Sequence, residues 1–234
     1  MSTHIGVITF PGSNGDRDSF DAFSHGLGVP ARLIDYRETD LSDCAAIVLP
    51  GGFSYGDHLR CGAIARFAPV MDSLRRFADE GGPVLGLCNG FQVLTEAHML
   101  PGALLRNQSL QFHCRWVDIR VETTRTAWTH ELSVGQVLRL PVAHGDGAFF
   151  ADDDTLDLME QRGQIVFRYC EPDGTVTPDS NFNGSARSIA GVCNERGNVV
   201  GMMPHPERAA DPILGSDQGL LILRAALEFL NVEV

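Results

Sequence analysis

Short apolar runs alternate with amphipathic segments along most of the chain. An apolar run of about four to eight residues between turn residues is typical of a buried strand, whereas apolar positions three and four apart form one face of a helix. The runs predict strands at 5–10, 31–35, 45–49, 83–87, 165–169, 189–193 and 199–203. The helical spacing predicts helices at 16–27 and 60–80, one that begins near Asn89, and a terminal one with an apolar stripe of Leu220, Leu223, Leu227 and Leu230.

The order of these elements predicts the architecture. Strands that alternate with helices form a mainly parallel sheet with helices on both faces. Alternating apolar residues give 116–140 a β character, and residues 194–198 predict the turn of a hairpin. No internal repeat, linker or low-complexity segment interrupts the pattern, so we expect one α/β domain over residues 1–234.

The composition argues against several classes of protein. The chain has 234 residues and a formal net charge of −12 without a run of basic residues, which is unlike a protein that binds nucleic acid phosphates. No secretion signal is evident, and no apolar run approaches the roughly 20 residues of a membrane span. The six cysteines are scattered and form no CxxC pair, so we expect a cytoplasmic protein without a disulfide framework or a zinc site.

The most informative local feature is the sequence from Gly86 to Gly90, which places Cys88 where a buried strand runs directly into a helix. This pattern resembles the nucleophile elbow of hydrolases, with cysteine in place of serine. The small residues Gly86 and Gly90 allow the close backbone packing that such a turn requires. A helix N-terminus favours the thiolate form of cysteine, which is the nucleophilic form. We therefore predict that Cys88 is a nucleophile.

A cysteine nucleophile needs a base, an orienting group and donors for an oxyanion. His205 and Glu207 follow the strand predicted at 199–203, so they lie at the carboxyl edge of the sheet, where ligands bind in open α/β folds. We predict a triad in which Glu207 orients His205 and His205 exchanges protons with Cys88. The predicted oxyanion donors are the backbone N–H of Asn89 and the loop that contains Gly51 and Gly52.

The loop at 11–16 also connects a strand to a helix. Its glycines could hold a phosphate, but it matches neither the dinucleotide-binding nor the P-loop pattern. The favoured interpretation is a polar turn whose Asn or Asp caps the following helix.

Taken together, the motifs resemble those of the class I (triad) glutamine amidotransferases, and more narrowly the glutaminase subunits of phosphoribosylformylglycinamidine synthases. The resemblance covers nearly the whole chain. It rests on FPGSN (10–14), PGGFSYGDHLRCGAIARF (50–67), PVLGLCNGFQ (83–92), VAHGDGAFF (142–150), NFNGS (181–185), IAGVCNERGNVVGMMPHPER (189–208) and LGSDQG (214–219). The chain departs from the usual family pattern at Gly15, His58, Asp146 and Phe182.

The resemblance implies a flavodoxin-like open sheet and a triad that matches Cys88, His205 and Glu207. It implies contacts to glutamine near Gly52, Gln92, His144 and Gly145. Ammonia released from glutamine would pass to a larger synthetase subunit that uses ATP and Mg, in a complex that also contains a small third subunit. That complex would convert formylglycinamide ribonucleotide to the amidine in purine biosynthesis. The chain itself would need no cofactor or metal.

Two alternatives remain open from the sequence. One is another enzyme of the same fold, such as a free-standing γ-glutamyl hydrolase or a glutaminase of a different synthase, which would turn over without this partner. The other is a redox-sensing or chaperone-like protein with a reactive elbow cysteine, which would have no need for His205 and Glu207 at the facing strand end.

Overall fold

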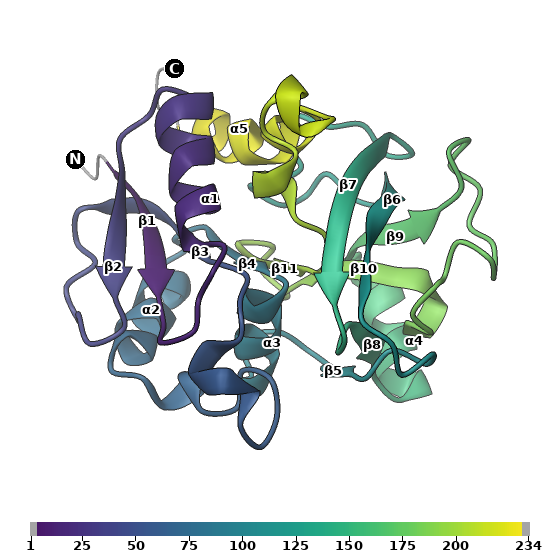
Figure 1. The fold of residues 1–234 in the computed structure, drawn as a ribbon, viewed down its shortest axis with the longest axis horizontal. Helices are drawn as coiled ribbons and strands as arrows, with labels where there is room; N and C mark the ends of the chain where they lie inside the picture. The colour runs from purple at the N-terminus through teal and green to yellow at the C-terminus, as the bar shows by residue number, and fades with distance from the viewer. Residues whose placement is uncertain (1–3, 231–234) are drawn as a thin grey trace.

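A nine-stranded sheet forms the centre of the molecule in the computed structural model, which describes residues 4–230 (Figure 1). The strand order is β2-β1-β3-β4-β11-β10-β9-β6-β7. The strands are β1 (His4–Thr9), β2 (Ala31–Asp35), β3 (Cys44–Leu49), β4 (Val84–Leu87), β6 (His113–Val121), β7 (Val137–His144), β9 (Ile165–Cys170), β10 (Ile189–Cys193) and β11 (Val199–Met202). A separate two-stranded sheet pairs β5 (Ala103–Leu105) with β8 (Ala148–Phe150).

The sheet has a parallel part and an antiparallel part. The pairs β1–β2, β1–β3, β3–β4 and β4–β11 are parallel, in the 2-1-3-4-5 order of flavodoxin-like sheets, as predicted. The predicted hairpin β10–β11 reverses the direction of the chain, and β10, β9, β6 and β7 then pair antiparallel. The predicted β region 116–140 is two long strands joined by turns, and β7 continues to His144.

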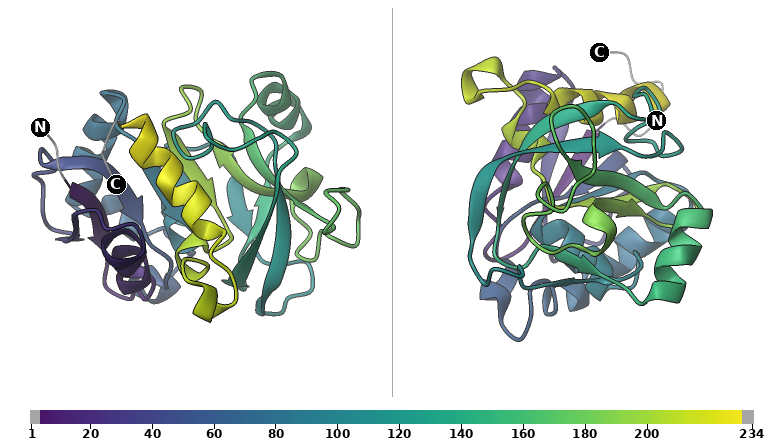
Figure 2. Two further views of the ribbon diagram at one scale, coloured as in Figure 1. Left: turned by 90° about the horizontal axis from the view of Figure 1, so that it is seen from above. Right: turned by 90° about the vertical axis from the view of Figure 1, so that its right-hand side faces the viewer.

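Helices cover both faces of the sheet, as the alternation of elements predicted. One face is covered by α1 (Asp16–Asp21), the π-helical turn Ala22–Gly26 and α5 (Gly219–Phe229), whose Phe23, Ile222, Leu223 and Leu227 pack on Val7, Val48 and Leu85. The other face is covered by α2 (Val70–Asp79), α3 (Asn89–Glu96) and α4 (Asp153–Gln161). Figure 1 shows α1 and α5 above the sheet and the other three below, and the left view of Figure 2 shows α5 lying across the sheet.

The helix predicted at 60–80 was wrong in its first half. Helix α2 begins only at Val70, directly after Pro69, because proline disfavours the α conformation at the residue before it. Upstream, Gly62 has a φ of +79°, and a Cβ there would lie 2.7 Å from the backbone N of Val93 in α3. The segment therefore forms turns and a short 3₁₀-helix, Ala65–Phe67, that pack against α3. Phe67, which the helical spacing would place on the apolar face of a helix at 60–80, is 73% exposed.

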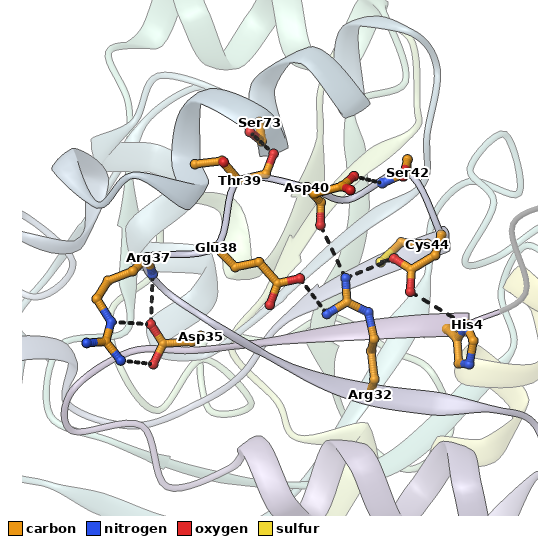
Figure 3. A network of polar contacts seen from close by, with 11 residues as sticks. His4, Arg32, Asp35, Arg37, Glu38, Thr39, Asp40, Ser42, Cys44 and Ser73 are labelled. Carbon is orange, nitrogen blue, oxygen red and sulfur yellow. Dashed lines mark hydrogen bonds and ion pairs between the residues drawn. The ribbon is translucent and has the colours of Figure 1, made fainter.

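Charged side chains protect the edge strand β2 (Figure 3). Arg32 forms ion pairs with Glu38 at 2.7 Å and Asp43 at 2.8 Å, and Asp35 forms one with Arg37 at 2.7 Å. Charges on an edge strand disfavour pairing with another chain. Among residues 4–230, the helices are too short or too polar to cross a lipid bilayer.

Candidate active site

Cys88 occupies a strained position between β4 and α3. Its φ of 50° and ψ of −103° are unusual for a residue with a side chain, and such strain is concentrated at functional sites. The turn depends on its two flanking glycines. A Cβ on Gly90 would lie 2.1 Å from the carbonyl oxygen of Leu49, and one on Gly86 would lie 2.8 Å from the backbone of Gly90. The structure thus contains the predicted elbow, with the cysteine side chain at the carboxyl edge of the sheet.

His205 and Glu207 form a buried hydrogen-bonded pair beside the elbow. His205 Nδ1 lies 2.5 Å from Glu207 Oε1, and both side chains are almost completely buried. The imidazole borders Cys88, since a Cβ on Gly51 would lie 2.8 Å from His205 Cε1 and 3.7 Å from Cys88 Cβ. The other ring nitrogen, Nε2, is buried and has no hydrogen-bond partner within residues 4–230. The structure therefore brings together all three residues of the predicted triad.

The charges around His205 favour its protonated form. Burial lowers the pKa of the imidazole, but the negative charges of Glu207 and Cys88 act in the opposite direction. The net result is a pKa of about 10, so His205 is an imidazolium ion at neutral pH. A buried cation next to a cysteine is the environment that supports a thiolate nucleophile.

The predicted oxyanion loop is held in place by the loop at 11–16. The backbone N–H groups of Asn14 and Gly15 donate to the carbonyl of Gly51 at 3.2 and 3.0 Å. Because a trans peptide directs its C=O and N–H in opposite directions, the Gly52 N–H points away from these two residues. The amides of Gly52 and Asn89 donate no hydrogen bond to any described residue, so both are available to an incoming oxyanion.

These bonds also decide the role of the loop at 11–16. Two of its amides are already engaged by Gly51, and Ser13 Oγ accepts from the Phe10 N–H at 3.0 Å. The loop at 11–16 therefore supports the loop that contains Gly51 and Gly52. Its amides are already engaged in this contact and are not free to bind a phosphate. The expected Asn or Asp cap was wrong, because the residue at the N-cap of α1 is Gly15, without a side-chain cap.

A cavity of about 440 Å³ opens beside the elbow. Cys88 lies in its wall, together with Gly52 and the residues predicted to contact glutamine, namely Gln92, His144 and Gly145. The thiol of Cys88 points toward the carbonyl of Ala143, at 3.7 Å. Gly51, Asn89 and His205 are not among the residues that line this cavity, although all three adjoin lining residues, since Gly51 precedes Gly52, Asn89 follows Cys88, and His205 borders Cys88.

His144 lies in the cavity wall as a neutral side chain. Burial, followed by the positive charge of His205, lowers its pKa to about 3. Its Nδ1 lies 3.1 Å from Asn107 Oδ1, an acceptor, which places the proton on Nδ1. Nε2 is then a buried acceptor without a partner in the described part of the chain. This geometry suits a donor group of a bound ligand.

Four further residues of the site were not singled out from the sequence. Asp57, Cys61 and Arg106 line the cavity, and Asn107 orients His144. Asp57 belongs to the GGFSYGD motif, which was the only signal for it, and burial raises its pKa. Both Cys61 and Arg106 contact Asp146, another residue of the cavity wall. The Cys61 thiol donates a hydrogen bond to Asp146 Oδ2 at 3.1 Å, and Arg106 Nε forms an ion pair with Asp146 Oδ1 at 3.6 Å.

Comparison with known proteins decides the family. The family model of the CobB/CobQ-like glutamine amidotransferase domain matches residues 2–218. A phosphoribosylformylglycinamidine synthase subunit PurQ from Thermomicrobium roseum is 60% identical over 221 residues, which are 94% of this chain and 94% of that protein. The chain belongs to this amidotransferase family. A PurQ subunit from Salinibacter ruber is 49% identical over 99% of both chains. The family proposed from the motifs is thus confirmed.

Solved structures agree with this family. A chain in the structure of PurLQS from Thermotoga maritima superposes with a TM-score of 0.86 and 39% identity, over 98% of this chain and 100% of that chain. A glutamine amidotransferase from the same organism, 18% identical over both full chains with a TM-score of 0.60, shares the fold. Family membership decides against the redox-sensing and chaperone-like alternatives.

Proposed function

We propose that this chain is the glutaminase subunit of phosphoribosylformylglycinamidine synthase, and that it hydrolyses glutamine through a thioester on Cys88. The observation that carries this proposal is the junction of three features at one sheet edge. These are a strained elbow cysteine, a buried imidazolium oriented by a carboxylate, and a cavity with unused backbone donors. Glutamine fits such a site, because its carboxamide is a neutral acyl group with a poor leaving group that needs protonation.

In the first half-reaction, the Cys88 thiolate attacks the carboxamide carbon of glutamine. Negative charge develops on the carboxamide oxygen, where the N–H groups of Gly52 and Asn89 would stabilise it; one such donor is typically worth about 3–4 kcal/mol. His205 then donates its proton to the departing nitrogen, and ammonia leaves. A γ-glutamyl thioester remains on Cys88.

In the second half-reaction, a water molecule hydrolyses the thioester, with His205 as the base. The thioester is neutral, so one of the two charges that raise the pKa of His205 has disappeared. His205 is then able to accept a proton from water, and glutamate leaves as the thiolate forms again. Glu207 holds the imidazole in place and stabilises its charge in both half-reactions.

The cavity wall would hold the other end of glutamine. We assign this role to Gln92, His144 and Gly145, because they line the same cavity as the thiol. The unpartnered Nε2 of His144 would accept a hydrogen bond from the substrate ammonium group. Gln92 Nε2 is bound to the carbonyl of Asp146 at 2.5 Å, which joins α3 to the segment after β7.

The ammonia would be used by a partner. We propose that a larger synthetase subunit uses it together with ATP and Mg to convert formylglycinamide ribonucleotide to the amidine, and that a small third subunit completes the complex. No cofactor is assigned to this chain. The six cysteines, all free thiols, support a reaction in the reducing cytoplasm.

A coupling experiment tests this assignment. The loop after Gly51 contains residues in left-handed conformations, including Tyr55 and Asp57, and the Ser54 N–H donates to Asn89 Oδ1 in the elbow at 3.1 Å. A partner that moves this loop would alter the oxyanion site. We expect weak glutaminase activity in the isolated chain and a rise of roughly tenfold or more, ~1.4 kcal/mol of coupling, with the loaded synthetase. A steady rate that no partner, nucleotide or ribonucleotide changes would favour a free-standing hydrolase.

A further inference from the structure

A second cavity lies on the opposite side of the triad from the proposed glutamine site. Its volume is about 710 Å³, and its walls come from α1, from β6 and β7, and from the segment after β11, elements that can be followed in Figure 1. Ala143 lines both cavities, so the two are separated by the backbone of β7. His205 and Glu207 line the second cavity. A molecule bound there would therefore contact the triad from behind.

The second cavity is acidic. Four carboxylates line it, against two basic side chains; the carboxylates belong to Asp18, Asp21, Glu207 and Asp211, and the basic side chains to His25 and Arg208. Both basic groups already have partners inside the cluster, because Arg208 lies 3.2 Å from Asp18 and His25 lies 3.4 Å from Asp21. Burial, together with the charge of Glu207, raises the pKa of Asp18. With four carboxyl groups against two basic side chains, the cluster has an excess of acidic groups.

Glu207 supplies an independent sign of a missing ligand. Its side chain is fully buried, and its Oε1 is bound to His205 and lies 3.6 Å from Arg208 Nε. The second carboxylate oxygen, Oε2, has no hydrogen-bond partner among the described residues. Buried carboxylate oxygens are normally paired, because an unpaired one loses its hydration without compensation. A donor that enters the second cavity could satisfy this oxygen.

The remaining wall is apolar. It is formed by Trp116 of β6, by Pro141 and Val142 of β7, and by Ala210 and Leu214 of the segment after β11. A ligand with a cationic end and an aliphatic stem would match both parts of the wall. Lysine and arginine side chains have this construction, with an apolar stem below a charged head.

We propose that the second cavity receives a lysine or arginine side chain of the synthetase subunit, and that this contact speeds the hydrolysis of the thioester. The proposal rests on the proposed function, since it assumes the Cys88 thioester and the partner. The cation would lie near Glu207 and reduce the effect of its negative charge on His205, while the hydrogen bond between Glu207 and His205 stays in place. The pKa of His205 would fall, so a larger fraction of His205 would stay neutral after its proton has left with ammonia, and neutral His205 is the base for water.

The other charged groups around His205 leave Glu207 as the group that a partner can influence. Cys88 in the elbow is neutral in the thioester, and His144 on β7 stays neutral because burial lowers its pKa to about 3. Arg208, on the same segment as Glu207, forms ion pairs both with Asp18 on α1, at 3.2 Å, and with Glu207 Oε1, at 3.6 Å. Glu207 is therefore the remaining negative charge that raises the pKa of His205 once the thioester has formed.

A cation built into the chain tests the mechanism without the partner. Leu214→Arg places a guanidinium at the cavity wall, and Ile213→Arg places the same charge on the adjacent residue, which is 87% exposed and outside the wall. In the isolated chain, Leu214→Arg should raise kcat for glutamine at neutral pH by about threefold or more and shift the acid limb of the kcat–pH profile to lower pH. Ile213→Arg should resemble the unmodified chain. Equal behaviour of the two variants would overturn the mechanism.

A second pair of variants tests the partner contact directly. Asp21→Asn with Asp211→Asn removes two cavity charges, and Asp153→Asn with Asp154→Asn removes two exposed charges from α4. We expect the first pair to weaken binding of the synthetase at least fivefold and to reduce its stimulation of the glutaminase, and the second pair to change neither. Unaltered affinity in the first pair would refute the contact. Since affinity is measured independently of turnover, a chain that binds through the cavity but hydrolyses no glutamine would contradict the proposed function instead.

Discussion

Replacement of Glu207 by glutamine isolates the effect of one buried charge on the triad. The amide keeps the shape of the side chain and an oxygen that can accept from His205 Nδ1, but it removes the negative charge. That charge is the largest influence that raises the pKa of His205 to about 10, against the opposing effect of burial. Without it, burial and a single remaining charge on Cys88 act on the imidazole, so its pKa should fall by at least one unit, or ~1.4 kcal/mol.

Two consequences are measurable. The alkaline limb of kcat/KM, which reports loss of the imidazolium proton, should move from near pH 10 to at least one unit lower. The hydrogen bond to His205 also loses the negative charge of its acceptor, which weakens the orientation of the imidazole. A bond to a charged group is worth about 1.5–3 kcal/mol, so kcat at neutral pH should fall by roughly 10- to 100-fold. His205→Ala should be far more damaging, because it removes both the acid and the base.

The assay is the release of glutamate as a function of pH, with the synthetase present. Glu228→Gln on the exposed side of α5 is the matched control, because it removes the same charge away from the triad. An unchanged alkaline limb in Glu207→Gln, together with a rate equal to that of the control, would refute the role assigned to Glu207.

Three further predictions concern the elbow, its packing and the buried histidine. Cys88→Ala should fold normally and lose glutamine hydrolysis by several orders of magnitude, yet the full complex should still make its product from a high concentration of ammonium; glutaminase activity in Cys88→Ala would contradict the thioester. Gly90→Ala should lower the free energy of unfolding by about 1–3 kcal/mol in chemical denaturation, because its Cβ would lie 2.1 Å from the backbone of Leu49. Gly26→Ala should cost less, because the nearest atom to its Cβ is the flexible end of Leu220 at 3.2 Å and the nearest backbone atom lies at 3.6 Å. The pKa of His144 is about 3 in the folded chain, against about 6.5 in the unfolded chain. Between these two values the unfolded chain binds more protons, so the free energy of unfolding should rise with pH across that window. His144→Gln should flatten this rise in melting curves recorded at a series of pH values.

The sequence predicted the parts of the site that depend on local patterns. Cys88 and His205 each follow a short apolar strand, and strand ends meet at one edge of a parallel sheet, so their proximity could be inferred without coordinates. The glycines at 86 and 90 marked the close packing of the elbow. The oxyanion loop was identified for a similar reason, since it follows β3, the neighbour of β4.

Other parts depend on tertiary contacts that no local pattern reveals. The helix predicted at 60–80 fails because Pro69 and the left-handed Gly62 divide it, although its apolar spacing continues through the break. Asn107 is a polar residue in a loop, and its role appears only when β7 brings His144 within 3.1 Å of it. The antiparallel half of the sheet could be predicted as β-structure, but its strand order, β10-β9-β6-β7, is set by long-range pairing.

The most direct test of the central claim is to trap the intermediate on the native chain. The synthase complex is mixed with glutamine, quenched in acid within its first turnovers, digested and examined by mass spectrometry. The account predicts one glutamyl group on the peptide that contains Cys88, formed at a rate that is competent for turnover, and none on the peptides of the other five cysteines. A glutamyl group on Cys61, or steady release of glutamate without any adduct on Cys88, would contradict it.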